Sequence, residues 1–207
     1  MGSQKNYPSD TPLPENAPKA LWMQDTGEML AHSNLKRYRE NTFLSFRSSP
    51  FGSGSHTLSD QNSFNLHFRG VPVYRSTGYY LHFSDPHNLL SYRHTRAHNT
   101  ILVDGIGQPF TTRAYGKLVR MLSGENISYA CGDASNAYCG LTDYPMWQKN
   151  FKNAKVEESV ANGFGETPLK KYRRHILLLH PNIVVIYDEL EAGKPVRWDW
   201  LLHSPVQ

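Results

Sequence analysis

The sequence predicts an all-β protein built as an antiparallel β-sandwich. Apolar and polar residues alternate with a period of two along several short segments, of which residues 64–69 (FNLHFR) are the clearest. The 207 residues include 15 glycines and 13 prolines, enough to end many short strands with turns. No long segment shows a helical stripe of apolar side chains. Many short strands without helices favour a sandwich.

Two parts are expected along the chain. Residues 1–19 are polar and proline-rich, which is typical of a disordered leader or linker, and residues 20–207 are long enough to form one β-sandwich domain. We expect strand on either side of Gly27. Further strands are predicted at residues 64–69, 100–104, 116–122 and 127–130, and the last three end at Asp-Gly, Ser-Gly and Gly-Asp pairs.

The last third of the chain combines an irregular segment with a strong hairpin signal. Residues 141–167 are polar and mixed, so a long loop or insertion is expected there, with Trp147 and Phe151 as its anchors. Residues 172–180 and 183–189 predict a hairpin that turns at Pro181 and Asn182. Residues 196–203 alternate again, and we expect more strands to follow them in a parent protein.

Composition narrows the partners only partly. The formal net charge of +4 favours a polyanion, either acidic polysaccharide, nucleic acid or anionic lipid, although a modest excess of basic residues also occurs without any partner. No run approaches the roughly 20 apolar residues that span a membrane. No signal peptide is visible in this chain. Cys131 and Cys139 could form one disulfide or remain two free thiols.

Two polar loops carry histidines together with arginines and tyrosines. The first reads FGSGSHTLSDQNSF from Phe51, and the second reads YRHTRAHNTILVDG and ends at Gly105. Such loops on a rigid sheet suit acid–base chemistry on an anionic substrate. With the later block RRHILLLHPNIVVIYDELEAGKPVRWDWLLHSP, they resemble the C-terminal β-sandwich of the heparinase II/III-like polysaccharide lyases. The resemblance covers residues 43–205, and RHTRAHNTILVDG is its most specific element.

The resemblance implies half of a two-domain enzyme. In such lyases an N-terminal α/α toroid packs on the sandwich, and the substrate lies between them. They cleave uronic-acid polysaccharides such as heparin, heparan sulfate or alginate by β-elimination. Nothing in this sequence indicates the toroid, so we expect a truncated piece whose partners are the missing toroid and an acidic polysaccharide. The parent protein is expected to be periplasmic or secreted.

The chemistry of β-elimination assigns roles to particular side chains. A base, His or Tyr, removes the proton α to the uronate carboxylate, while a donor or cation neutralises that carboxylate and a Tyr protonates the leaving oxygen. The resemblance implies that His56 lies beside the carboxylate and that Tyr79 and Tyr80 are catalytic. The alternatives are a loop histidine bonded to backbone and tyrosines packed on the sheet.

Three polar residues of the second loop are candidates for binding a polyanion. Arg93 and Arg96 supply charge for sulfate or carboxylate groups, and Asn99 follows them. The alternative for the two arginines is a solvated or ion-paired loop. Asn99 has the alternative of bracing its loop, as Asp60 and Asn62 are expected to brace the loop of His56.

The family's structural zinc site is expected to be lost. His98 matches one ligand position, but Leu58 and Ser76 stand where the resemblance places a histidine and an aspartate. An aliphatic side chain cannot bind a metal, and one imidazole makes a poor zinc site. We therefore expect either no tightly bound zinc at this position or a zinc completed by ligands that the sequence does not identify, and we name no other cofactor. Packing and a hydroxyl hydrogen bond are expected to take over the structural task.

Three functions compete at this point. The first is the sandwich module of a uronic-acid polysaccharide lyase. The second is a non-catalytic carbohydrate-binding or structural domain that is inactive without its helical partner. A nucleic-acid-binding module comes last, because the sequence has no recognition helix, zinc finger or row of stacking aromatic residues.

Overall fold

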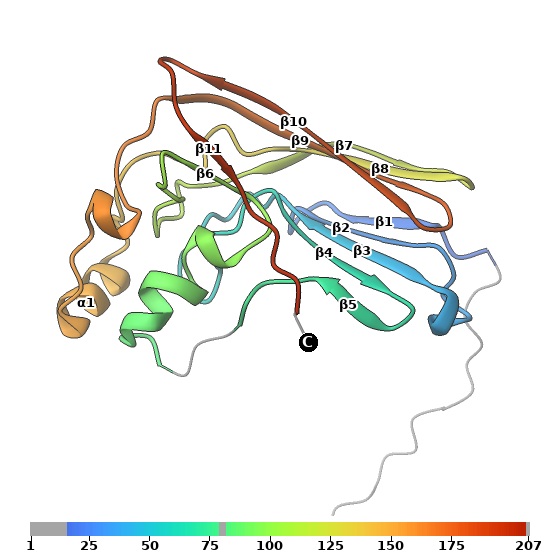
Figure 1. Cartoon of the computed structure of the whole chain (residues 1–207), viewed down its shortest axis with the longest axis horizontal. Helices are drawn as coiled ribbons and strands as arrows, with labels where there is room; N and C mark the ends of the chain where they lie inside the picture. The colour runs from blue at the N-terminus through green and yellow to red at the C-terminus, as the bar shows by residue number, and fades with distance from the viewer. Residues whose placement is uncertain (1–15, 79–81, 206–207) are drawn as a thin grey trace, which may run out of the picture.

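The structure, a computed structural model, describes residues 16–78 and 82–205 and confirms the antiparallel β-sandwich (Figure 1). One layer is a five-stranded sheet in the order β1-β2-β3-β4-β5, and the other is a four-stranded sheet in the order β10-β9-β8-β7. A two-stranded ribbon joins β11 to β6. All strand pairs in the three sheets are antiparallel.

The elements match most of the expected segments. The strands are β1 Ala20–Met23, β2 Glu28–His32, β3 Thr42–Arg47, β4 Ser63–Phe68, β5 Val71–Tyr74, β6 Ile101–Val103, β7 Lys117–Ser123, β8 Ile127–Asp133, β9 Leu169–Leu179, β10 Ile183–Ala192 and β11 Trp198–Trp200. The helical segments are α1 Pro145–Ala154, 3-10 turns at Tyr38–Glu40, Thr95–Ala97 and Val160–Asn162, and a π-helical turn at Asn88–Tyr92.

The core lies between the two sheets and follows the period-two pattern. In β3, Leu44 and Phe46 point inward and are buried, while the alternate residues Phe43, Ser45 and Arg47 are half-buried on the outer face. Ile176 and Leu178 of β9 meet them from the other sheet. At one margin the sheets are joined directly, because the Ala20 amide donates to Ser123 Oγ over 2.9 Å.

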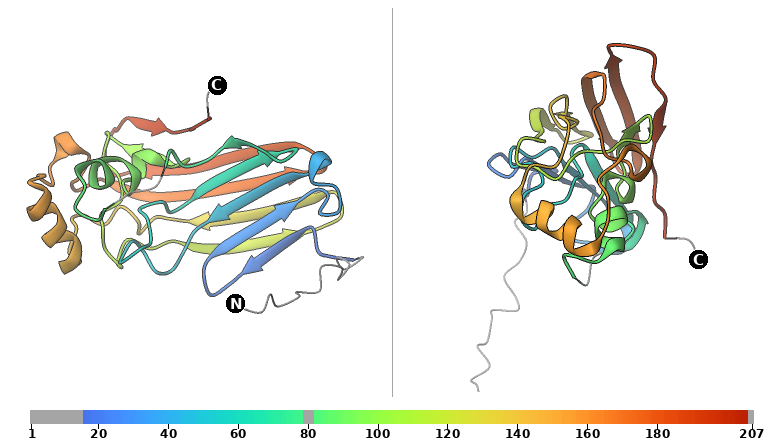
Figure 2. Two further views of the ribbon diagram at one scale, coloured as in Figure 1. Left: turned by 90° about the horizontal axis from the view of Figure 1, so that it is seen from below. Right: turned by 90° about the vertical axis from the view of Figure 1, so that its left-hand side faces the viewer.

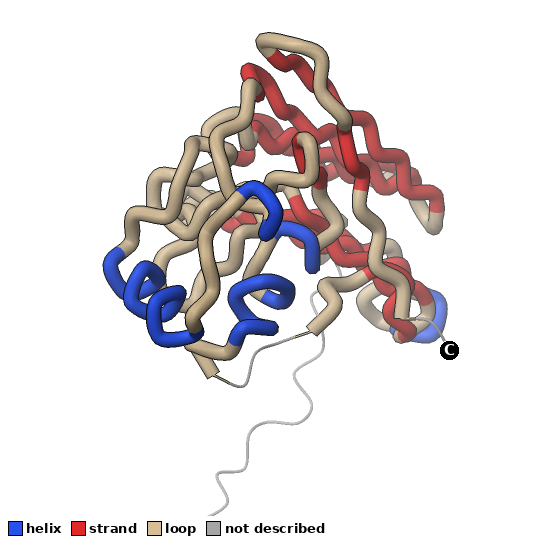
Figure 3. Tube along the Cα trace, turned by 60° about the vertical axis from the view of Figure 1, so that its left-hand side comes forward, coloured by secondary structure: helices blue, strands red, loops and turns tan. Residues whose placement is uncertain are grey.

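A helical end closes the sandwich, and here the sequence prediction was wrong. The orange α1 and the green turns near residues 88–97 lie together at one end of the molecule (Figure 2), and most of the helical segments gather on that side (Figure 3). The expected loop therefore contains a ten-residue helix. Trp147 and Phe151, four residues apart, bury one face of α1 against Phe110 and Phe164.

Strand β11 is shorter than expected because its partner is short. It pairs with all three residues of β6, from Trp198 opposite Val103 to Trp200 opposite Ile101. Beyond β11 the chain reaches the five-stranded sheet. There the backbone N–H of Arg75, directly after β5, donates to the His203 carbonyl over 3.0 Å.

Cys131 is buried in β8 and Cys139 is exposed, and both are free thiols. None of the helices in the described parts of the chain is long and apolar enough to cross a membrane.

Candidate functional site

A hollow of about 550 Å³ lies beside His56 on the outer face of the five-stranded sheet. Its wall includes outward side chains of β2, β3 and β4, such as Leu30, Phe43 and Asn65, and the loop that carries His56 and Leu58. His56 is exposed at the hollow, and its ring centroid lies 5.2 Å from that of Phe83. This arrangement presents an imidazole to a ligand that enters the hollow.

The loop of His56 is held firmly at both ends. Gln61 is buried, and its side-chain oxygen accepts from the Ser49 backbone N–H over 2.6 Å. The Gln61 backbone N–H donates to the Gln108 side-chain oxygen over 2.9 Å. In the middle, the buried Ser53 hydroxyl donates to the Pro109 carbonyl over 2.7 Å. The loop is therefore a fixed platform, as a site requires.

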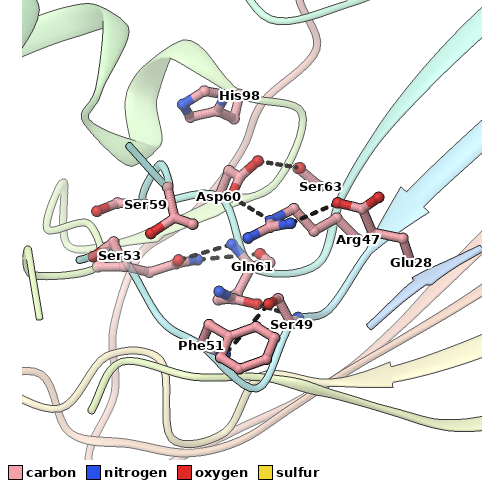
Figure 4. A network of polar contacts seen from close by, with 12 residues as sticks. Glu28, Arg47, Ser49, Phe51, Ser53, Ser59, Asp60, Gln61, Ser63 and His98 are labelled. Atoms are coloured by element: carbon pink, nitrogen blue, oxygen red, sulfur yellow. Dashed lines mark hydrogen bonds and ion pairs between the residues drawn. The ribbon is translucent and has the colours of Figure 1, made fainter. Parts of the chain in front are cut away.

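Three charged side chains line the hollow (Figure 4). Arg47 of β3 lies between two carboxylates: Nη1 donates to Glu28 Oε1 over 2.6 Å, and Nε donates to Asp60 Oδ1 over 3.1 Å. The carboxylate of Asp60 also accepts from the Ser63 hydroxyl over 3.4 Å. Asp60 thus braces the loop, in agreement with the expectation for this residue, and Arg47 is already engaged with two acids.

His98 lies deep in the protein next to Ser76. Its Nδ1 is 2.8 Å from Ser76 Oγ, so a hydroxyl does occupy the position where the resemblance places an aspartate ligand. Burial lowers the pKa of His98, and the negative charge of Asp60 opposes this shift. Its Nε2 has no hydrogen-bond partner among the residues that the structure describes.

These residues do not fit a zinc ion. Leu58 lines the hollow with an aliphatic side chain, and Ser76 offers a neutral hydroxyl. Across residues 16–78 and 82–205, no three His, Cys, Asp or Glu side chains form a group that could hold a metal. The loss of the family's zinc stays a prediction, which a metal assay can test.

Arg93 is buried, not presented to a ligand. Its Nη2 donates to the carbonyls of Ser53 and Gly54 over 2.8 and 2.9 Å. The guanidinium carbon lies 3.5 Å from the centroid of the Trp147 ring and 5.1 Å from that of Phe110. A cation stacked in this way ties α1 to the His56 loop, so a structural role explains Arg93 better than substrate binding.

Arg96 is half-buried and holds a second buried histidine in place. Its Nη2 donates to the Asn162 carbonyl over 2.6 Å, and its Nε donates to His94 Nδ1 over 3.2 Å. The other ring nitrogen of His94 therefore carries the proton and donates to the Gly163 carbonyl over 3.0 Å. Burial and the Arg96 charge lower the pKa of His94 to about 3.

Asn99 is a buried brace between strands, which was the alternative to substrate binding. Its Nδ2 donates to the Phe64 carbonyl over 2.8 Å, and its Oδ1 accepts from the His203 amide over 2.7 Å. Asn62 is buried as well and donates to the Gly132 carbonyl over 3.2 Å, as expected for a residue that braces the first loop.

Sequence reasoning missed the buried ion pair of Arg174 and Asp188. Two parallel hydrogen bonds of 2.8 Å join the guanidinium to the carboxylate, and the Arg174 side chain is 0% exposed. Its Nη1 also donates to the carbonyls of Asn62 and Asn99, over 2.9 and 2.7 Å. A signal existed, because a hairpin that turns at Pro181 and Asn182 places residues 174 and 188 opposite each other.

The structure thus separates the candidate site residues. His56 is exposed at the hollow, while Arg93, His98 and Asn99 are buried and Arg96 is half-buried. Tyr79 and Tyr80 lie outside the described residues, so their catalytic role stays a prediction.

Solved structures of lyases have a similar fold. The heparinase III BT4657 gene product matches 95% of this chain at 16% identity with a TM-score of 0.67, over 25% of its own length. The heparan sulfate lyase HepC from Pedobacter heparinus matches 89% at 16% identity with a TM-score of 0.63, over 24% of its length. A further heparinase III structure matches 83% at 15% identity with a TM-score of 0.54, over 22% of its length. These likenesses establish the fold.

The chain spans about a quarter of the length of these proteins. No curated protein sequence matches it. The sequence model of the family described as heparinase II/III-like, C-terminal, matches residues 19–207, which is nearly the whole chain. This chain therefore belongs to the heparinase II/III-like C-terminal domain family.

Proposed function

We propose that this chain is the β-sandwich module of a polysaccharide lyase that cleaves uronic-acid-containing polysaccharide by β-elimination. One observation carries the proposal: His56 stands exposed at a hollow on a sheet face, on a loop fixed by buried hydrogen bonds. An accessible imidazole on a fixed loop suits a proton transfer next to a carboxylate.

The proposed catalytic roles depend on which side chains already pair with other residues of this chain. His56 lies beside the substrate carboxylate, and Tyr79 and Tyr80 are the candidates for proton transfer to and from the sugar. Arg47 already binds Glu28 and Asp60, so it is a poor source of charge for neutralising the substrate carboxylate. That charge is supplied by the α/α toroid that forms the other wall of the site.

The substrate class follows from the same chemistry. Heparin, heparan sulfate and alginate all contain a uronate with the acidic proton that the mechanism needs. A net charge of +4 supports a polyanion as partner, and nucleic acid is not proposed. Such polymers are extracellular, so the parent enzyme is proposed to be periplasmic or secreted.

The test is the ultraviolet absorbance of unsaturated uronate, the product that β-elimination leaves on the new chain end. The chain is incubated with heparin, heparan sulfate, alginate and hyaluronan, first alone and then with a helical toroid supplied in trans. We expect product when both parts are present. Absence of product under both conditions would contradict the catalytic proposal.

The burial of Arg93, His98 and Asn99 favours a second candidate, a non-catalytic carbohydrate-binding module. If these residues only hold loops together, the face beside His56 binds sugar without acting on it. Retention on a heparin column that salt reverses, without product in the absorbance assay, would support this candidate.

A further inference from the structure

A groove of about 550 Å³ lies on the side of the sandwich where β5 and β10 are the edge strands of their sheets. Both sheets line it with apolar side chains, and Trp200 of β11, which is 46% exposed, closes one side. The lining runs along residues 64–68 of β4 and 182–186 at the start of β10, a length of about 13 Å along each strand. No Lys, Arg, Asp or Glu side chain lines the part of the groove that the structure describes. A narrow apolar groove of this length suits an unbranched apolar chain.

Thr42 places an unpaired hydroxyl in the wall of this groove. The residue begins β3, lies opposite Phe68 in the pair of β3 with β4, and is 2% exposed. Its hydroxyl forms no hydrogen bond with any residue in the described part of the chain. Buried hydroxyls are normally paired, because an unpaired one costs free energy. A ligand with a polar group at the Phe68 end of the groove would supply the missing partner.

A smaller polar hollow of about 290 Å³ continues from the groove at this end. It shares Phe68 and Asn182 with the groove and is also lined by Arg69. The guanidinium carbon of Arg69 lies 5.0 Å from the centroid of the Phe68 ring. Among residues 16–78 and 82–205, no acidic side chain forms an ion pair with Arg69. Its charge is therefore available to an anion that enters from the groove.

The surface around this polar hollow carries an excess of positive charge. Residues 36–40, KRYRE, supply three cations and one acid, and Arg69 adds a fourth cation, which leaves a net charge of +3. All five charged side chains are exposed. The Tyr38 ring joins this loop to the turn after β4, because a Cβ added to Gly70 would lie 3.2 Å from Tyr38 Cδ2. The loop lies at the opposite end of the molecule from α1 (Figure 1). The charge complements an anionic group at the end of the groove.

We propose that this groove binds an unbranched fatty acid. The alkyl chain lies along the apolar walls, and the carboxylate lies at the Phe68 end, where the Thr42 hydroxyl donates to it and Arg69 supplies the opposite charge. The groove shares no lining residue with the hollow beside His56. This inference is therefore independent of the proposed function.

The first experiment is isothermal titration calorimetry of the full chain with octanoate, decanoate and the uncharged 1-decanol, below the concentrations at which they aggregate. Each methylene group that leaves water tightens binding about fourfold, so we expect decanoate to bind about 15-fold more tightly than octanoate. The carboxylate should make decanoate bind more tightly than 1-decanol.

Two substitutions test the position of the carboxylate. Thr42→Val keeps the shape of the side chain and removes the hydroxyl, and it should weaken decanoate binding roughly tenfold. Arg69→Gln should weaken decanoate binding about threefold, since the charge is exposed, and leave 1-decanol binding unchanged. The matched control is Arg120→Gln, which removes the same charge from an exposed residue of β7 and should leave both affinities unchanged.

Two outcomes would overturn the inference without reference to any variant. One is that the unchanged chain does not bind decanoate, and the other is that octanoate and decanoate bind equally well. If Thr42→Val and Arg69→Gln both bind decanoate as the unchanged chain does, the fatty acid is not held in this groove with its carboxylate at the Phe68 end, and the proposal fails.

Discussion

Replacing Asp188 by Asn is expected to destabilise this protein, because it breaks a buried ion pair. The Arg174 side chain is 0% exposed and that of Asp188 is 9% exposed, and two hydrogen bonds of 2.8 Å join them. The Trp200 indole also donates to Asp188 over 2.9 Å. Asparagine would leave a buried guanidinium without a counter-charge and turn an amide group toward it.

The magnitude follows from that burial. Removing one partner of a buried ion pair costs about 3–5 kcal/mol, because the remaining charge is desolvated without compensation. For a chain of this size, unfolding in urea depends on denaturant with a slope of about 2–3 kcal/mol per molar. The midpoint of Asp188→Asn is therefore expected about 1–2 M below that of the unchanged protein, measured by far-ultraviolet circular dichroism.

Asp199 provides a matched control, since it forms a similar fork with Arg197 at 2.8 and 3.0 Å. The Arg197 side chain is 70% exposed, so solvent screens the pair and Asp199→Asn should scarcely move the midpoint. If the two substitutions lower the midpoint equally, Asp188 is not what stabilises the buried Arg174, and the reasoning fails.

Three further predictions concern the candidate site and its surroundings. His56→Ala should abolish any lyase turnover and change the free energy of unfolding by less than about 0.5 kcal/mol, because the side chain is exposed; a collapsed melting curve would contradict this. Leu58→His combined with Ser76→Asp should create zinc affinity, measured by atomic absorption after dialysis, and no gain in bound zinc would show that these positions were misassigned. His94 has a folded-state pKa of about 3 against 6.5 when exposed, so the unfolded chain binds a proton that the folded chain does not, and stability falls as pH decreases below 6.5. Urea unfolding measured from pH 7 downward should show the free energy of unfolding falling by about 1.4 kcal/mol more per pH unit in the unchanged protein than in His94→Gln. Equal slopes against pH for the two proteins would refute the assignment of this loss to His94.

Strands with one buried face were predictable, whereas the helix was not. In β3 and β9, buried positions alternate with half-buried or exposed ones, because only one face of each strand meets the opposite sheet. Helix α1 buries only Trp147, Asn150 and Phe151, and its other positions are mostly polar. A segment with so few apolar residues is hard to distinguish from a loop by its sequence. Packing of Trp147 and Phe151 against Phe110 and its neighbours stabilises the helix.

The position of His56 on the surface was predictable, because it lies in a glycine- and serine-rich loop. The burial of Arg93 and Asn99 was not. Arg93 meets the carbonyl of Ser53, 40 residues earlier, and Asn99 meets the amide of His203, 104 residues later. Contacts at such separations depend on how the sheets are layered, so the sequence of the loop alone leaves binding and bracing equally open.

Arg174 connects the stability of the fold to the candidate site. Its Nη1 donates to the carbonyl of Asn62, where the first histidine loop ends, and to the carbonyl of Asn99, directly after His98. One buried guanidinium therefore cross-links the two loops that carry Leu58 and His98, the positions at which the sequence resemblance predicts zinc ligands of the family. Hydrogen bonds between protein groups alone make this cross-link, so we expect it not to depend on a metal. It follows that Asp188→Asn, which leaves Arg174 without its counter-charge, should loosen both loops as well as lower the urea midpoint, and that added zinc should not restore them.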